Sequence, residues 1–125
     1  MKERLYFGEL ENLSEEAVRS VTANQFYVEE ETLKQYNFII ADIDHQDYEG
    51  SAYFLLEHQE TGALFEVTGS HCSCMGFEDQ WEPTPTTVEY LCSKHYSYGN
   101  KHSDMKLFMN KLFNKHLVQS ILELN

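Results

Sequence analysis

The sequence predicts an α+β domain in which an antiparallel β-meander of three or four strands packs against N-terminal and C-terminal helices. Three features support this class: central runs rich in β-branched and aromatic residues, a capped helix start before them, and a helical apolar stripe after them. The chain has 125 residues, of which 42% are hydrophobic, so it is long enough to close a core of its own. We expect a single domain, 1–125.

The first helix is expected to begin at Ser14, whose side chain can accept hydrogen bonds from free backbone amides. Glu15 and Glu16 follow it and suit the positive end of the helix dipole. This helix should end near Asn24. Residues 29–36 fit either a short second helix or an exposed connection, and the sequence leaves both open.

Three strands are expected over residues 36–44, 51–58 and 63–68, because each run is rich in strand-forming side chains. A longer polar loop over residues 45–50 should join the first two strands. Gly62 can adopt a positive φ before the third strand, which suits a tight hairpin. Aromatic residues at strand-like or connecting positions are expected mostly in the core: Tyr27, Tyr36, Phe38, Tyr53, Phe54 and Phe65.

Two further helices are expected after the strands. One should begin near Thr86, after two prolines, with a threonine as its N-cap. The last should begin at Asp104, and its apolar residues recur at spacings of three and four: Met105, Phe108, Met109, Leu112, Phe113, Leu117, Ile121 and Leu124. The face that carries this stripe is expected to pack on the sheet, while the opposite face meets water.

The chain is strongly acidic, with 21 Asp and Glu against 9 Lys and Arg and a formal net charge of −12. Residues 1–93 hold 19 acids and 4 bases, whereas residues 94–125 hold 2 acids and 5 bases. The negative charge of residues 1–93 disfavours direct binding to nucleic acid, which depends on a positively charged surface. No run approaches the ~18 apolar residues of a membrane span and no secretory signal is present, so we expect a soluble, cytoplasmic protein without a membrane partner.

The segment from Gly69 to Pro83, GSHCSCMGFEDQWEP, combines thiols, an imidazole, carboxylates and the single tryptophan. Together with DYEGSA at residues 47–52, and with Thr86, Thr87 and Leu91 downstream, it resembles a family of small uncharacterised phage and prophage proteins with a GSHCSCxGxExQWEP motif. The resemblance covers roughly residues 38–95. It implies a phage accessory gene, a class that includes many inhibitors of host enzymes and defence systems, and it implies no particular activity.

The same region offers a set of metal ligands. A zinc ion could be coordinated by three sulfurs and one imidazole: Cys72, Cys74, Cys92 and His95. His71 is a further possible ligand. However, Cys-x-Cys bends less comfortably around a tetrahedral ion than Cys-x-x-Cys, and small thiols often pack a loop against a sheet. We therefore expect reduced, packed thiols, with Trp81 filling the core, and no cofactor. Zinc is the alternative.

The residue types of a thiol hydrolase are also present: Cys72 or Cys74 as nucleophile, His71 or His95 as base, and Glu78 or Asp79 as the orienting acid. Adjacent side chains on an extended chain point to opposite faces, which disfavours the pair His71 and Cys72. We therefore expect a binding protein rather than an enzyme, with a Cys/His-dependent metal protein or thiol enzyme centred on residues 71–95 as the alternative.

Acidic residues are the candidates for a binding surface. They form two groups: Asp42, Asp44, Asp47 and Glu49 near the first predicted hairpin, and the consecutive Glu29, Glu30 and Glu31. The hairpin group departs from a calcium loop, because Asp47 replaces the glycine of position six and Tyr53 replaces the glutamate of position twelve. The field of these acids would attract a basic surface. We expect the protein to inhibit a host protein, a defence factor or one that handles nucleic acid, by occupying such a surface.

Overall fold

A computed structural model describes most of the chain: residues 4–46, 49–72 and 75–91, with Ser93, Lys111 and Asn114. The chain forms two compact units, Met1–Pro85 and Thr86–Asn125. The described elements are, in chain order, β1 (Leu5–Gly8), α1 (Glu15–Phe26), α2 (Glu30–Leu33), β2 (Tyr36–Gln46), β3 (Glu49–His58), β4 (Leu64–His71), β5 (Thr84–Thr86) and α3 (Val88–Leu91). Whether the chain is one domain, 1–125, stays a prediction.

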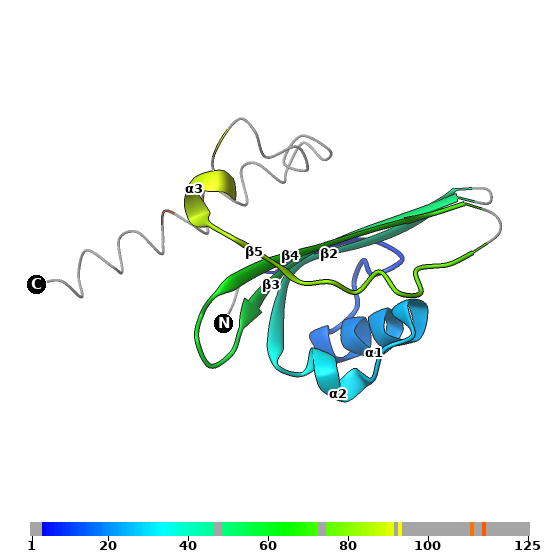
Figure 1. Cartoon of the computed structure of the whole chain (residues 1–125), viewed down its shortest axis with the longest axis horizontal. Coiled ribbons are helices and arrows are strands. Elements are labelled where there is room, and N and C mark those ends of the chain that lie inside the picture. The colour runs from blue at the N-terminus through cyan, green and yellow to red at the C-terminus, as the bar shows by residue number, and fades with distance from the viewer. Residues whose placement is uncertain are drawn as a thin grey trace, which may run out of the picture. The chain divides into compact units, whose positions relative to one another are not determined.

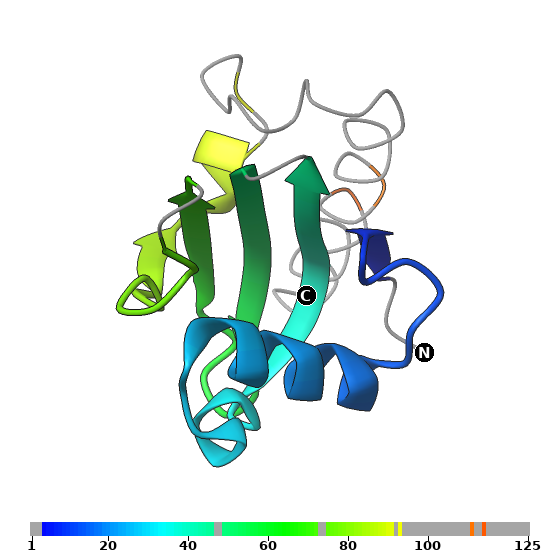
Figure 2. The same cartoon turned by 90° about the vertical axis from the view of Figure 1, so that its right-hand side faces the viewer.

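The strands form one five-stranded sheet in the order β1-β2-β3-β4-β5 (Figures 1 and 2). β2, β3 and β4 are antiparallel neighbours, so the predicted meander and the α+β class are confirmed. β1 runs parallel to β2, from Leu5 opposite Ile40 to Gly8 opposite Ile43. The sheet thus has five strands, whereas the sequence predicted three or four. β1 and β5 are only 4 and 3 residues long, too short for an alternating pattern.

The hairpin between β2 and β3 is tighter than its sequence predicts. β2 continues to Gln46 and β3 begins at Glu49, so the polar loop predicted over residues 45–50 is wrong. His45 lies opposite Gly50 within the ladder. Backbone groups make the ladder, so polar side chains can continue a strand beyond its apolar run. The turn before β4 is as predicted, with Gly62 at a φ of +74°.

Local side-chain chemistry sets the ends of α1. The Ser14 hydroxyl accepts a hydrogen bond from the Ala17 backbone N–H at 3.1 Å, so the predicted N-cap is confirmed. The helix continues to Phe26, two residues beyond the predicted end, and Tyr27 closes it in the left-handed conformation with a φ of 56°. α2 confirms the short-helix alternative for this part of the chain.

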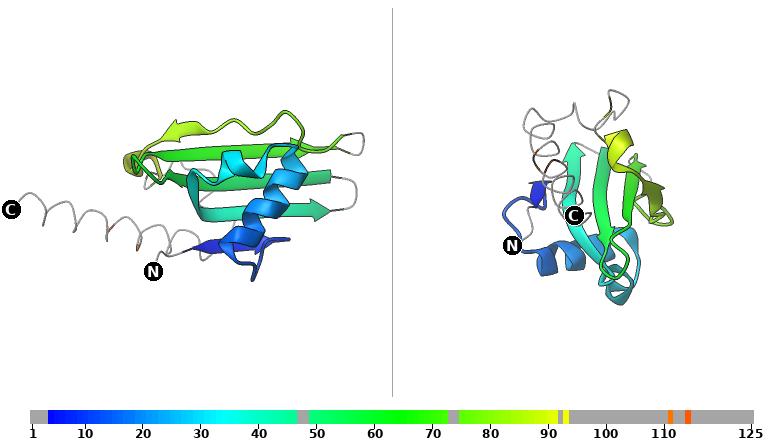
Figure 3. Two further views of the ribbon diagram at one scale, coloured as in Figure 1. Left: turned by 90° about the horizontal axis from the view of Figure 1, so that it is seen from below. Right: turned by 90° about the vertical axis from the view of Figure 1, so that its left-hand side faces the viewer.

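The core of the first unit lies between α1, α2 and the face of the sheet that they cover (Figure 3). Phe26 of α1 stacks on Phe77 with ring centroids 4.9 Å apart and meets Phe54 of β3 edge-on at 5.6 Å. Trp81 packs against the same cluster, as predicted. The buried members are Leu10, Val18, Ala23, Phe26, Leu33, Tyr36, Phe38, Ala41, Ile43, Ala52, Phe54, Leu56, Val67 and Phe77.

In the second unit, the structure describes one short helix. α3 begins at Val88 and not near Thr86, because Thr84–Thr86 forms β5. The Thr87 hydroxyl accepts a hydrogen bond from the Tyr90 N–H at 3.2 Å, as expected of a threonine cap. The helix predicted from Asp104 lies outside the described residues, except for Lys111 and Asn114, which are helical. No helix of the described residues is long and apolar enough to cross a membrane.

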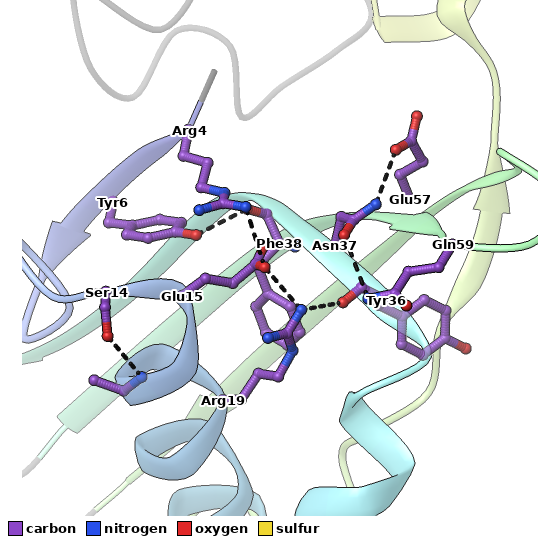
Figure 4. A network of polar contacts seen from close by, with 11 residues as sticks. Arg4, Tyr6, Ser14, Glu15, Arg19, Tyr36, Asn37, Phe38, Glu57 and Gln59 are labelled. Atoms are coloured by element: carbon purple, nitrogen blue, oxygen red, sulfur yellow. Dashed lines mark hydrogen bonds and ion pairs between the residues drawn. The ribbon is translucent and has the colours of Figure 1, made fainter. Parts of the chain in front are cut away.

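A polar network ties the start of α1 to β1 and β2 (Figure 4). Glu15 Oε1 accepts hydrogen bonds from Arg19 Nη2 at 2.8 Å and from Arg4 Nη2 at 3.2 Å. Glu15 Oε2 accepts one from the Phe38 N–H at 2.8 Å. Arg19 Nη2 also donates to the Tyr36 carbonyl at 2.8 Å. One carboxylate therefore connects α1, β2 and Arg4, the residue that precedes β1.

Tyr6 of β1 adds a neutral hydrogen bond to this network, donating from its hydroxyl to the Phe38 carbonyl at 3.0 Å. Burial, reinforced by the Glu15 charge, raises the pKa of Tyr6 from 10.0 to about 12. The folded state therefore favours the neutral phenol, whose contribution to stability is complete below pH 10.0 and is lost as the pH rises through about 12. Tyr6→Phe should lower the free energy of unfolding at neutral pH by about 1 kcal/mol.

The difference in the free energy of unfolding between Tyr6→Phe and the wild type should shrink as the pH rises above 10.0, the ordinary pKa of tyrosine. Urea unfolding followed by Trp81 fluorescence at a series of alkaline pH values measures it. Tyr27→Phe is the matched control, because the Tyr27 side chain is 77% exposed. A difference that stays constant over this range would contradict the prediction.

Candidate functional site

The surface of the first unit carries far more acids than neighbouring bases can neutralise. Its described bases, Arg4, Arg19 and Lys34, form ion pairs with only two acids, Glu15 and Glu31. Other acids of this unit are exposed and pair with no described lysine or arginine: Glu9, Glu11, Glu16, Glu29, Glu49, Glu60, Asp79 and Glu82. The negative charge seen in the sequence is therefore largely uncompensated at this surface.

The three consecutive glutamates lie at the beginning of α2. Glu29 is exposed and precedes the helix. Glu30 is half-buried and its Oε1 accepts a hydrogen bond from the Ser20 hydroxyl of α1 at 2.9 Å, which ties the two helices together. Glu31 has an 82% exposed side chain and pairs with Lys34 at 3.2 Å. The structure thus brings this predicted group together on one short helix.

The second predicted acidic group does not form an exposed turn. Asp42 is only 1% exposed and lies in the middle of β2, opposite Tyr53, so its prediction as part of an accessible binding surface is wrong. Asp44 is half-buried in the same strand, and Glu49 is exposed at the start of β3. Asp47 lies outside the described residues. Positions 42 and 44 already belong to the strand predicted over residues 36–44, and in β2 they lie on one face of the sheet.

Tyr27 is a surface residue that the sequence reasoning placed in the core. This residue is 77% exposed, whereas the predicted core residues Tyr36, Phe38 and Phe54 are buried. Tyr27 caps α1 with a positive φ, and its N–H bonds to the Ala23 carbonyl. The turn from α1 to α2 therefore directs this ring outward. The three glutamates that follow Tyr27 in the sequence were the signal that this residue lies at the surface.

Of the predicted zinc ligands, the described residues include only Cys72. Cys72 is exposed just after β4, while Cys74, Cys92 and His95 lie outside the described residues, so this set stays a prediction. Within the described ranges, no group of three or more His, Cys, Asp or Glu is arranged to hold a metal ion.

The arrangement around His71 does not suit a base for Cys72. His71 Nδ1 lies 3.0 Å from the Cys72 carbonyl oxygen, and His71 Nε2 lies 3.0 Å from His45 Nε2. Both ring nitrogens therefore contact groups other than the thiol. This geometry agrees with the expectation that the adjacent pair is a poor nucleophile and base.

The contact between His45 and His71 is a feature that the sequence reasoning missed. Their imidazole centroids are 5.0 Å apart, although the residues belong to β2 and β4. The sequence placed His45 in a loop, so its alignment with Gly50 and His71 went unnoticed. An alternating pattern extended by one polar residue would have placed His45 in the strand, but its contact with His71 depends on the register of three strands.

Comparisons with known proteins identify no relative of this chain. No family model, no curated protein and no solved structure matches it.

Proposed function

We propose that the protein is an acidic binding domain that occupies a basic surface of a host protein and blocks it without chemistry. The observation that carries the proposal is the uncompensated charge of the first unit, where three described bases pair with only two acids. A surface of this sign attracts basic grooves, including those that otherwise bind nucleic acid. The host setting rests on the resemblance to phage and prophage proteins.

We assign the contact surface to an acidic corner, defined as Tyr27, Glu29, Glu30 and Glu31. Tyrosine is frequent among the residues that dominate interface energy, and its ring can stack on arginine. Tyr27 is 77% exposed, so the ring is available. The corner is also held in place, because Tyr27 and Val28 both donate their N–H to the Ala23 carbonyl and Ser20 donates to Glu30. A preorganised surface loses little entropy on binding.

The test begins with the partner itself. A tagged full chain is used to capture proteins from host lysate at low salt, and the captured protein is purified so that the dissociation constant can be measured directly. We expect affinity to fall steeply as salt rises, because exposed charges are screened over ~8 to 10 Å at moderate ionic strength. The combined reversal Glu29→Lys, Glu30→Lys, Glu31→Lys should weaken binding by about tenfold or more, mainly through slower association.

The matched control reverses three exposed acids outside the corner, Glu11→Lys, Glu60→Lys and Glu82→Lys, and changes the net charge by the same amount. We expect a smaller loss of affinity from this control. Tyr27→Ala should weaken binding about tenfold, and the salt dependence of binding should be the same as in the wild type. Binding that is indifferent to salt and to the corner reversal would overturn the proposal, and equal loss from both reversals would remove its assignment to the corner.

A further inference from the structure

Two imidazoles meet over a glycine at one end of the sheet. In the strand register, His45 of β2 lies opposite Gly50 of β3, and Gly50 lies opposite His71 of β4. A β-carbon at position 50 would overlap His71 Nε2 and lie 2.7 Å from His45 Cδ2. Glycine therefore leaves the space in which rings from two non-adjacent strands touch, with their Nε2 atoms 3.0 Å apart.

The outer contacts of the two rings favour a hydrogen on each Nδ1. His45 Nδ1 is 2.9 Å from Glu9 Oε1, and His71 Nδ1 is 3.0 Å from the Cys72 carbonyl oxygen. A carboxylate and a carbonyl can only accept, so each Nδ1 carries a hydrogen. A neutral imidazole with its hydrogen on Nδ1 has a lone pair on Nε2. When both rings are neutral, two lone pairs face each other, and a shared proton or a metal ion would hold the Nε2 atoms together.

We propose that His45 and His71 bind a divalent transition-metal ion through their Nε2 atoms, with Zn²⁺ as the representative ion. Imidazole nitrogen is a preferred ligand of zinc, copper and nickel. Metal-binding histidines almost always donate their other N–H to a carboxylate or a backbone carbonyl, which is the role that Glu9 and Cys72 fill here. This site is independent of the acidic corner.

The distance between the two nitrogens suits ligands of one ion. With metal–nitrogen bonds of about 2.0 to 2.1 Å, two neighbouring ligands lie about 2.9 to 3.4 Å apart for angles between right-angled and tetrahedral. The observed separation is 3.0 Å. Since the described residues supply no third ligand in a metal-holding group, water would complete the coordination and leave an open site.

The surroundings hold the pair in place and admit an ion. Phe77 packs against both rings, with centroids 4.6 Å from His71 and 5.7 Å from His45. The His45 side chain is 29% exposed and that of Glu9 is 43% exposed, so a hydrated ion can reach the site from solvent. The Glu9 carboxylate adds negative charge beside the ligands, and the acidic surface raises the local concentration of cations.

The test is calorimetric titration of Zn²⁺ into the metal-free full chain. We expect one Zn²⁺ per chain at this site, with a dissociation constant weakened about 100-fold by His45→Gln and by His71→Gln. His58→Gln is the matched control, because His58 also lies on the sheet, at the end of β3, and contacts Gln35 instead of a second histidine. Affinity should be unchanged in this control.

A second variant keeps both imidazoles and removes only the space between them. Gly50→Ala should weaken Zn²⁺ binding at least about tenfold in a protein whose circular dichroism shows that it is folded. In the metal-free protein, ¹⁵N NMR should show both Nδ1 atoms protonated, and Zn²⁺ should shift the two Nε2 signals. Retained Zn²⁺ affinity in His45→Gln with loss in Cys72→Ser would assign the ion to the cysteines and overturn the proposal. A proton shared between the Nε2 atoms with no Zn²⁺ uptake would also overturn it.

Discussion

Replacing Trp81 with alanine is expected to lower the free energy of unfolding by about 3 to 5 kcal/mol. The ring lies 5.5 Å from Phe26 of α1 and 5.5 Å from Phe54 of β3, and it stacks near Phe38 at 6.2 Å, measured between centroids. It thus fixes the segment after β4 onto the helix and the sheet together. Alanine would leave a cavity that these rigid aromatic neighbours cannot fill.

The measurement is urea unfolding followed by far-UV circular dichroism, because the chain has only 1 tryptophan and its fluorescence is lost in the variant. Trp81→Phe should lose less, about 1 to 2 kcal/mol, since it keeps most of the ring volume. Tyr27→Ala, at a ring that is 77% exposed, should stay within about 0.5 kcal/mol of the wild type. A loss below about 1 kcal/mol in Trp81→Ala would place this ring outside the core.

Glu15→Gln is expected to lower the free energy of unfolding by about 2 to 4 kcal/mol. The Glu15 side chain is 12% exposed and that of its partner Arg19 is 14% exposed, so the ion pair at 2.8 Å is shielded from water. Arg19 Nε is buried and has no hydrogen-bond partner among the described residues. Loss of the carboxylate would therefore leave a buried guanidinium without its counter-charge.

Glu16→Gln is the matched control, because Glu16 is adjacent, exposed and also in the first turn of α1. Its effect should stay within about 0.5 kcal/mol. Urea unfolding followed by Trp81 fluorescence compares the two variants. Added salt should change the difference between them only slightly, since a shielded pair is weakly screened. Equal stabilities of the two variants would mean that the Glu15 network contributes nothing beyond an exposed charge.

The candidate sites were predictable from the sequence to different degrees. The glutamates at 29–31 are neighbours in the chain, so their grouping needed no tertiary information. Asp42 lies in the strand that the sequence predicts, but its burial was not predicted, because a strand's sequence does not show which of its faces is covered in the fold. The pair His45 and His71 depends on the register of three strands and joins residues 26 positions apart. No local pattern contains that information.

Several local features could be predicted from nearby residues alone. Ser14 begins α1, Gly62 turns the chain before β4, and alternating side chains form the meander. Each depends on interactions within a few residues, so a short window is sufficient. Two contacts between distant segments could be seen only in the folded protein: β1 pairs with β2, and two imidazoles meet over Gly50. These contacts join segments that are brought together by burial of the shared core. Their stability therefore depends on the whole fold and not on any single segment.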